Sequence, residues 1–386
     1  MKGLHTITVL FGASLTVMAG TAISPALPGI ADYFSGLTDA ANWARRVLTA
    51  PALFIVLTAP IAGLVIDRVG PKPVFLTGLG LYAVAGTSGL WVDSLTALLI
   101  GRAALGIAVG LIMPSCSTLI GILFVGPERV KVVGWQAACM TFGGVIFLIM
   151  GGLLAETGWR GPFAIYLASL LILPGVLALP HRRAETPPAG AEGFPWSRLI
   201  GVYLAAIFGM ACFFAVPTQT PFLLVERGTD SSAVVGLTIA SASLAAAIVA
   251  LFYRRVRGDR SGTLMLGLAF VLIGMGLILV AFAGPYGNLL ASIAIVGLGF
   301  GVLLPTLQTM VLAIAPDHSR GRATGLLTMS VFIGQFLSAD LTGFLASGGH
   351  THRPFLGFGL IAATIAIGVL AGNQIRVRRR GTVLTK

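Results

Sequence analysis

The chain has 386 residues, of which 56% are hydrophobic and only 10% are charged. A soluble domain carries about a quarter charged residues, so this composition excludes a soluble globular protein and indicates a membrane protein. The formal net charge of +12 does not indicate a nucleic-acid-binding protein, because the basic residues lie in short loops between apolar runs and form no basic face.

Apolar runs along the chain predict twelve transmembrane helices. A helix needs about 20 mostly apolar residues to cross a bilayer. Twelve such runs with short loops account for nearly the whole chain, so we expect an all-α membrane protein without a separate soluble domain. In chain order the predicted helices cover residues 4–30, 47–66, 73–91, 95–124, 132–154, 159–179, 199–224, 231–253, 263–283, 288–315, 324–346 and 353–373.

A polar stretch in the middle of the chain is the one segment typical of a linker. It runs from His181 to Arg198 and contains two consecutive prolines, Pro187 and Pro188. The predicted organisation is an N-terminal six-helix bundle over 1–180, a cytoplasmic linker over 181–198, a C-terminal six-helix bundle over 199–375, and a basic cytoplasmic tail over 376–386.

The distribution of basic residues predicts the orientation in the membrane. Lys and Arg are enriched in cytoplasmic loops. With both termini cytoplasmic, 19 of the 25 basic residues fall on the cytoplasmic side, and one, Arg102, lies away from the ends of a predicted helix. The five that fall outside are Arg45, Arg46, Arg160, Arg227 and Arg353.

The two halves of the chain repeat each other at an offset of 191 residues. Two six-helix bundles related by an axis along the membrane normal give such a pattern. Glycines at small-xxx-small spacing let helices approach closely. The matched positions are Gly106, Gly110 and Pro114 with Gly297, Gly301 and Pro305; Arg129, Lys131 and Gly134 with Arg320, Arg322 and Gly325; and Gly143 and Gly152 with Gly334 and Gly343.

Two charged residues break this symmetry. Arg102 corresponds to Ile293, and Asp340 corresponds to Ile149. They are the one clear base and the one clear acid inside predicted helices. A duplicated scaffold does not need them, so both are candidates for function.

The loop between the second and third predicted helices reads Gly63-Leu-Val-Ile-Asp67-Arg68-Val-Gly70-Pro71-Lys72-Pro73. It resembles the signature loop of the major facilitator superfamily. Other features resemble the twelve-helix drug/proton antiporter branch of that family, although Phe147 and Leu148 stand where the branch has Gly-Pro. These features are the ending Pro25-Ala-Leu-Pro28-Gly of the first helix, Arg102 with Gly106 and Gly110, and Gly151-Gly152 followed by Gly158-Trp159-Arg160.

The resemblance implies a secondary active transporter that moves a small organic solute by alternating access, with proton-coupled export favoured. The alternative is an uptake symporter or uniporter of the same fold. It implies no enzyme activity, no cofactor beyond a proton gradient, and a monomer whose partners are the solute and membrane lipid, without nucleic acid. We expect a multi-pass protein of the plasma membrane, the inner membrane in a bacterium.

The resemblance also assigns a conformational switch to the signature loop. Gly63 and Asp67 are four residues apart and share a helix face. In the family the aspartate locks one conformation; the alternative is a plain cap at the membrane boundary. The residues assigned to the switch are Gly63, Asp67, Arg68, Gly70 and Lys72.

Arg102 and Asp340 are the predicted proton-coupling residues. Arg102 follows Asp93 by nine residues, which places it about 13 Å deep by helix rise. Asp340 precedes Ser347 by seven residues, about 10 Å from the outer end of its helix. Ionisable residues inside membranes are costly and mark ion or proton pathways. The alternatives are a structural hub for Arg102, and a permanent ion pair or an exposed vestibule position for Asp340.

Polar residues inside the predicted helices are candidates for lining a solute cavity near the membrane midplane. Each has the alternative role of an interhelical hydrogen bond. The sparse charge predicts a neutral, amphiphilic or singly charged solute. His350 and His352 lack a third ligand, so no metal site is predicted. The cavity candidates are Thr16, Thr21, Phe213, Thr218, Gln219, Thr220, Thr306, Gln308 and Gln335.

Overall fold

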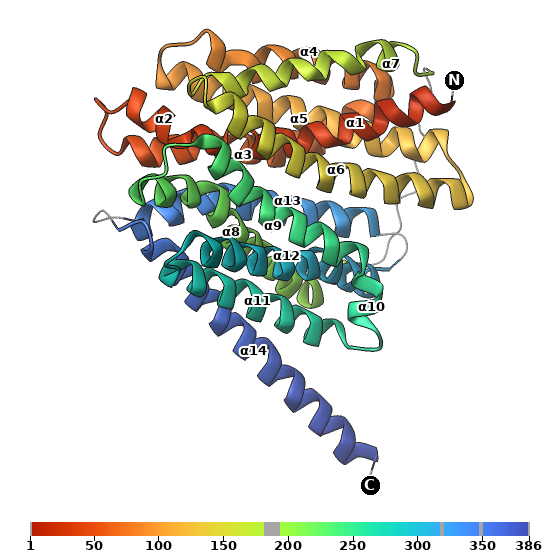
Figure 1. Cartoon of the computed structure of the whole chain (residues 1–386). Helices are drawn as coiled ribbons and strands as arrows, with labels where there is room; N and C mark the ends of the chain where they lie inside the picture. The colour runs from red at the N-terminus through yellow and green to blue at the C-terminus, as the bar shows by residue number, and fades with distance from the viewer. Residues whose placement is uncertain (1, 181–193, 317–319, 347–349, 385–386) are drawn as a thin grey trace. The chain divides into compact units, whose positions relative to one another are not determined.

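The computed structural model describes residues 2–180, 194–316, 320–346 and 350–384. The regular secondary structure of these residues is entirely helical (Figure 1). Eleven of the described helices are long and apolar enough to cross a membrane, and Gly161–Leu177 is a shorter apolar helix. This count confirms the predicted all-α membrane fold.

The first ten elements correspond to the first six predicted helices. They are α1 (Lys2–Thr21), η1 (Ser24–Ala26), α2 (Leu27–Tyr33), α3 (Ala40–Val69), α4 (Pro71–Gly86), η2 (Thr87–Leu90), α5 (Leu95–Leu123), α6 (Gly126–Ala155), η3 (Gly161–Ile172) and α7 (Leu173–Leu177).

The remaining elements correspond to the last six predicted helices. They are α8 (Trp196–Glu226), α9 (Ser232–Leu251), α10 (Tyr253–Arg257), α11 (Gly262–Phe282), α12 (Tyr286–Ile314), α13 (Arg320–Ala346) and α14 (Arg353–Leu384). Helix α14 continues into the predicted basic tail as far as Leu384 (Figure 1).

The chain forms two compact units. One contains Met1–Pro188 and Pro217–Ala240, and the other contains Ala189–Val216 and Ser241–Lys386. The division therefore runs through α8 and α9. Most of the predicted linker lies outside the described residues, and the predicted bundle boundaries stay predictions.

Prolines interrupt the first predicted helix. The expected single helix over 4–30 is instead α1, a 3-10 turn beginning at Ser24, and α2, with Pro25 and Pro28 at the starts of the last two. Proline has no N–H to donate and is accommodated in the first turn of a helix, so each proline ends one segment and starts the next.

The second predicted helix begins earlier than expected. We predicted residues 47–66, with Arg45 and Arg46 in a loop, whereas α3 begins at Ala40 and includes both arginines. We placed the two arginines in a loop because charged residues are rare inside membrane-spanning helices. The correction matters because Arg45 is only 5% exposed.

The repeated glycines form equivalent helix contacts in each unit. A Cβ atom on Gly106 of α5 would collide with the carbonyl oxygen of Pro51 in α3, and one on Gly297 of α12 would collide with that of Ala242 in α9. Pro51 and Ala242 are themselves separated by the repeat offset. The predicted close approach of small residues is therefore present in both units.

The next glycine of each pair repeats the contact one turn later. A Cβ on Gly110 would lie 2.8 Å from the Cβ of Thr58, and one on Gly301 would lie 3.0 Å from the Cβ of Val249. Thr58 and Val249 are again related by the repeat offset. The duplication thus preserves a helix pair as well as the glycines.

Candidate functional site

The signature loop turns at Gly70, between α3 and α4. Gly70 has φ 86°, a conformation that favours glycine, and Pro71 occupies the first position of α4. Lys72 then donates hydrogen bonds from Nζ to the carbonyl oxygens of Leu177 at 2.6 Å and Leu179 at 2.7 Å. A cation at the C-terminal end of α7 satisfies carbonyl groups that the helix leaves unpaired.

The other switch residues of the loop are open to their surroundings. Asp67 and Arg68 are exposed. Apart from its chain neighbours and the adjoining backbone of its own helix, no described atom lies within 4 Å of the position that a Cβ on Gly63 would occupy. The lock that the family resemblance implies for Gly63 and Asp67 stays a prediction.

Arg102 of α5 is completely buried and bonds three other elements. Its Nε donates to the carbonyl oxygen of Val47 in α3 at 2.9 Å, and its Nη2 donates to that of Ala19 in α1 at 2.5 Å. Its Nη1 donates to the hydroxyl of Tyr166 in η3 at 2.8 Å. The guanidinium thus donates hydrogen bonds to uncharged oxygen atoms from three segments.

Two tyrosines extend this hub. Tyr82 of α4 is buried, its ring centroid lies 5.7 Å from that of Tyr166, and its hydroxyl donates to the carbonyl oxygen of Leu15 at 2.8 Å. The network thereby joins α1, α3, α4, α5 and η3. This geometry is the one expected if Arg102 is a structural hub, the alternative to a proton-coupling role. A coupling role for Arg102 stays a prediction.

Asp340 lies in α13 of the other unit and is half-buried. Two residues earlier, Ser338 is buried and donates from Oγ to the carbonyl oxygen of Ala211 in α8 at 3.0 Å. Residues two apart lie on nearly opposite sides of an α-helix, so Asp340 lies on a different face of α13 from Ser338. Its proton-coupling role is untested.

Five cavity candidates lie in the first unit. Thr218, Gln219 and Thr220 are fully buried, and Thr16 is nearly so. Thr16 Oγ1 has no hydrogen-bond partner among the described residues. Half-buried Thr21 instead donates to the carbonyl oxygen of Val17 in its own helix at 2.9 Å, so this bond is not the interhelical one that we gave as the alternative.

The candidates in the second unit differ in exposure. Thr306 is buried, and its Oγ1 hydrogen-bonds the Tyr253 hydroxyl at 2.9 Å. Phe213 is half-buried and stacks on Phe300, with ring centroids 3.7 Å apart. Gln335 is buried, whereas Gln308 is exposed. The structure leaves the cavity role of all four candidates untested.

Sequence reasoning missed Arg45, which contacts one of the candidates. Its Nε and Nη2 both donate to Oε1 of Gln219, at 3.1 and 2.7 Å. Its guanidinium carbon lies 4.5 Å from the centroid of the Phe222 ring. The repeat contained the missing signal, because the offset of 191 residues maps Arg45 onto Gly236, so this charge also occurs in one half only.

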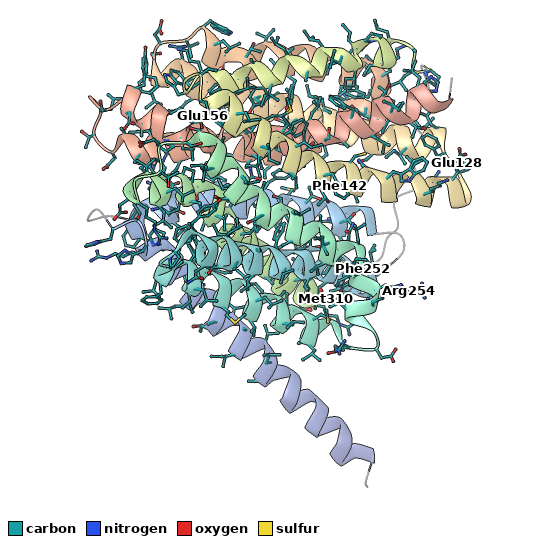
Figure 2. All side chains as sticks on the ribbon, in the orientation of Figure 1. Glu128, Phe142, Glu156, Phe252, Arg254 and Met310 are labelled. Atoms are coloured by element: carbon teal, nitrogen blue, oxygen red, sulfur yellow. The ribbon has the colours of Figure 1, made fainter. Side chains whose placement is uncertain are left out.

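Two further polar contacts join the Pro217–Ala240 segment to the N-terminal helices. Ser24 Oγ donates to the carbonyl oxygen of Pro217 at 2.5 Å. At the end of α6, labelled in Figure 2, Glu156 accepts from Ser231 Oγ at 2.7 Å and from the Ala233 amide at 2.9 Å. These hydrogen bonds lower the pKa of the Glu156 carboxyl below its usual 4.5.

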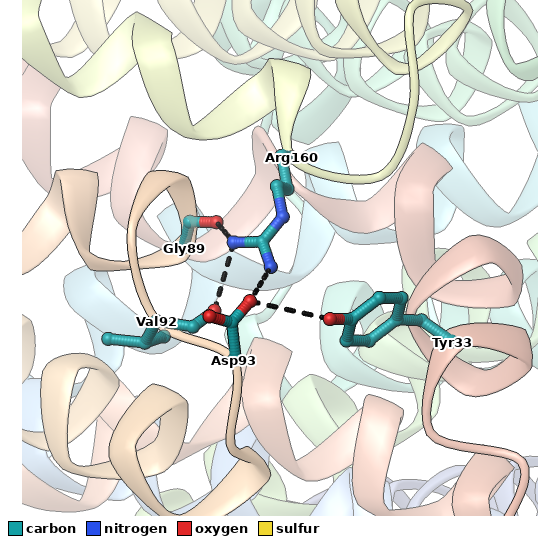
Figure 3. Close-up of polar contacts among 5 residues, drawn as sticks. All are labelled: Tyr33, Gly89, Val92, Asp93 and Arg160. Atoms are coloured by element: carbon teal, nitrogen blue, oxygen red, sulfur yellow. Dashed lines mark hydrogen bonds and ion pairs between the residues drawn. The ribbon is translucent and has the colours of Figure 1, made fainter.

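An ion pair fixes the loop after α6 (Figure 3). Arg160 Nη2 contacts Asp93 Oδ1 at 2.6 Å, and its Nη1 donates to the carbonyl oxygens of Gly89 and Val92, each at 2.9 Å. The hydroxyl of Tyr33 donates to the same Asp93 oxygen at 3.4 Å. Arg160, one of the residues that carry the family resemblance, thus stabilises a loop.

A sequence model of the Major Facilitator Superfamily matches residues 9–255 and 229–381. The chain belongs to this superfamily. It is therefore a multi-pass membrane transporter and not an enzyme, as the resemblance implied. The two matches overlap and together account for nearly the whole described chain.

Relatives and solved structures of the superfamily agree with this assignment. The chain is 28% identical to the MFS-type transporter YceJ of Bacillus subtilis (strain 168), with 84% of each chain covered. It is 27% identical to the class C tetracycline resistance protein of Escherichia coli, covering 85% of this chain and 86% of the relative. A D-xylose-proton symporter structure has a TM-score of 0.77 at 16% identity, covering 94% of this chain and 96% of that chain, which shows the shared fold.

Proposed function

We propose that this transporter exports a small organic solute in exchange for protons, by alternating access. The observation that carries the direction is the similarity along nearly the whole chain to a tetracycline resistance protein and, at 22% identity, to the quinolone resistance protein NorA of Staphylococcus aureus (strain COL). Resistance by a transporter is the expected result of moving a compound out of the cell.

Asp340 supports the coupling to protons. It is a half-buried acid inside α13, one of the helices long and apolar enough to span a membrane. Acids in such positions commonly take up and release protons during transport. Its absence from the repeat-equivalent position, Ile149, argues against a purely architectural role.

Reconstituted protein tests both parts of this proposal. Proteoliposomes containing a pH-sensitive dye are supplied with a panel of solutes that includes lipophilic cations, organic anions and uncharged aromatics. Export in exchange for protons predicts a solute-dependent proton flux opposite to the solute flux. We expect this flux to be lost in Asp340→Asn and kept in Asp259→Asn, a matched change at an exposed acid.

Each alternative gives a different result. Solute and proton moving in the same direction would identify an uptake symporter, and solute flux without proton flux would identify a uniporter. A proton flux that survives in Asp340→Asn would place the coupling at another residue.

A further inference from the structure

Arg45 carries a buried charge inside a membrane-spanning helix. It is the sixth residue of α3 and only 5% exposed. A charged side chain within a membrane span is costly, so such residues face protein or a wet pathway and have partners there. The partners of Arg45 therefore indicate its role.

The partners found for Arg45 are neutral. The Gln219 side-chain oxygen accepts two of its five N–H groups, and the ring of Phe222 lies against the guanidinium. Among the described residues, no acidic side chain forms an ion pair with Arg45. A neutral amide and an aromatic face stabilise a cation, but they leave its charge uncompensated.

Polar atoms beside this contact also lack partners. Asn42 lies one turn before Arg45 on the same face of α3, and its Oδ1 is buried without a hydrogen-bond partner among the described residues. Thr220, next to Gln219, is fully buried, and its Oγ1 is likewise unpartnered. Buried polar atoms normally have partners, so unpaired ones beside a buried charge indicate a place where a polar ligand binds.

The repeat shows that the scaffold does not require this charge. The equivalent position in α9 is Gly236, where a Cβ would lie 2.5 Å from the carbonyl oxygen of Leu148 in α6. The same place in the fold is thus filled by close backbone packing in one half and by a buried guanidinium in the other. A function specific to the first half explains this difference better than packing does.

From these observations we propose that Arg45 binds the anionic group of the transported solute, and that Gln219 occupies its donors when the solute is absent. The substrate class is then a small organic anion or zwitterion with a carboxylate or a comparable oxyanion. A guanidinium binds the two oxygens of such a group through two parallel hydrogen bonds. The single side-chain oxygen of Gln219 cannot accept two bonds in that parallel geometry. This inference rests on the proposed transport function and narrows its substrate.

Thermal unfolding of the purified protein tests the binding site without requiring transport. A panel of carboxylates, beginning with benzoate, salicylate and hexanoate, is compared with the corresponding amides at millimolar concentration. We expect at least one carboxylate to raise the Tm while its amide does not, because a ligand that binds the native state stabilises it. Arg45→Gln should weaken this carboxylate's binding at least about tenfold, which is the usual effect of losing a charged hydrogen bond.

The neighbouring Arg46 provides a matched control. Arg46→Gln removes one positive charge, as Arg45→Gln does. The guanidinium of Arg46 lies over the Trp43 ring, 4.7 Å from the centroid. Arg46→Gln should keep the carboxylate effect. Gln219→Glu should abolish it, because the variant supplies a permanent carboxylate to Arg45. If Arg45→Gln does not fold, Gln219→Glu and Arg45→Lys give the same test.

Several results would overturn the proposal. They are the absence of any carboxylate effect in the wild type, an equal effect of the amides, or an effect that survives in both Arg45→Gln and Gln219→Glu. If Arg45 and Gln219 formed only a closing contact, Arg45→Gln would slow transport of cationic, neutral and anionic solutes alike.

Transport measurements separate this inference from the proposed function. Proton-coupled export that persists for anions in Arg45→Gln would overturn the anion site and leave the function intact. Conversely, Arg45-dependent carboxylate binding without any proton flux would support the site and refute the coupling.

Discussion

The Nη1 group of Arg102 donates a hydrogen bond to the hydroxyl of Tyr166 at 2.8 Å, in a fully buried position where α5 meets η3. The same guanidinium bonds backbone carbonyl oxygens in α1 and α3. Removing it would leave three buried acceptors unpaired, and each unpaired group costs about 1–3 kcal/mol.

Arg102→Ala should therefore destabilise the protein severely. We expect a lower Tm and a large loss of monodisperse protein in size-exclusion chromatography. Tyr166→Phe removes one of the three bonds and should have a smaller effect. A variant of Arg102 that folds normally but no longer couples protons to solute would instead support the coupling role.

The glycine contacts of the repeat predict paired mutational effects. Gly106→Ala and Gly297→Ala should each lower stability by about 1–3 kcal/mol, because the new methyl group would overlap a backbone carbonyl. Gly134 and Gly325, also related by the repeat, have no described atom within 4 Å of a Cβ position. Alanine there should be neutral or slightly stabilising, since glycine is unfavourable in helices. Equal Tm values for both sets would contradict the packing argument.

Glu156 predicts a pH-dependent contribution to stability. Its folded-state pKa is lowered by the Ala233 amide and the Ser231 hydroxyl. A lowered pKa means that the ionised carboxylate stabilises the folded state at pH above 4.5, and that this stabilisation is lost as pH falls through the lower folded-state value. Glu156→Gln should reduce the Tm at neutral pH, and the difference from wild type should shrink in acid.

Asp230→Asn is the control for Glu156, because it makes the same change in charge at an exposed position in the adjacent loop. Its effect on the Tm should be small at neutral pH. A difference between wild type and Glu156→Gln that widens as the pH falls would be inconsistent with the observed hydrogen bonds.

The Arg160 cluster predicts unequal effects for the two members of one ion pair. The Asp93 side chain is 81% exposed, so Asp93→Asn should cost about 1 kcal/mol or less. Arg160→Ala also removes the bonds to Gly89 and Val92 and the contact with the Trp159 ring, so it should lower the Tm considerably more. High salt should reduce most of the Asp93→Asn effect but only the ion-pair part of the Arg160→Ala effect. Equal losses would mean that the ion pair dominates.

Much of the fold follows from patterns that the sequence displays directly. Apolar runs reveal the membrane-spanning helices because a bilayer requires a minimum length. The spacing of Gly106 and Gly110, repeated by Gly297 and Gly301, predicted close helix contacts, and the structure confirms them with equivalent partners. Such features depend on local sequence or on a repeat, so no tertiary information is needed to find them.

The candidate site was less predictable because its chemistry depends on tertiary partners. The sequence placed Arg102 inside a helix, but only the fold reveals that its donors meet Val47, Ala19 and Tyr166. Arg45 was assigned to the loop between the predicted helices 4–30 and 47–66. The pattern of apolar residues predicted neither the start of α3 at Ala40 nor the contact between Arg45 and Gln219.

The close packing of Gly236 against Leu148 has a consequence for the origin of the protein. Any arginine at position 236 would displace the backbone of α6, so the second half has no room for a counterpart of Arg45. An ancestor assembled from two copies of the second half would lack this charge altogether. Two copies of the first half would lack the glycine contact instead. The two copies have therefore diverged at this position, the first half carrying the charge and the second half the glycine contact.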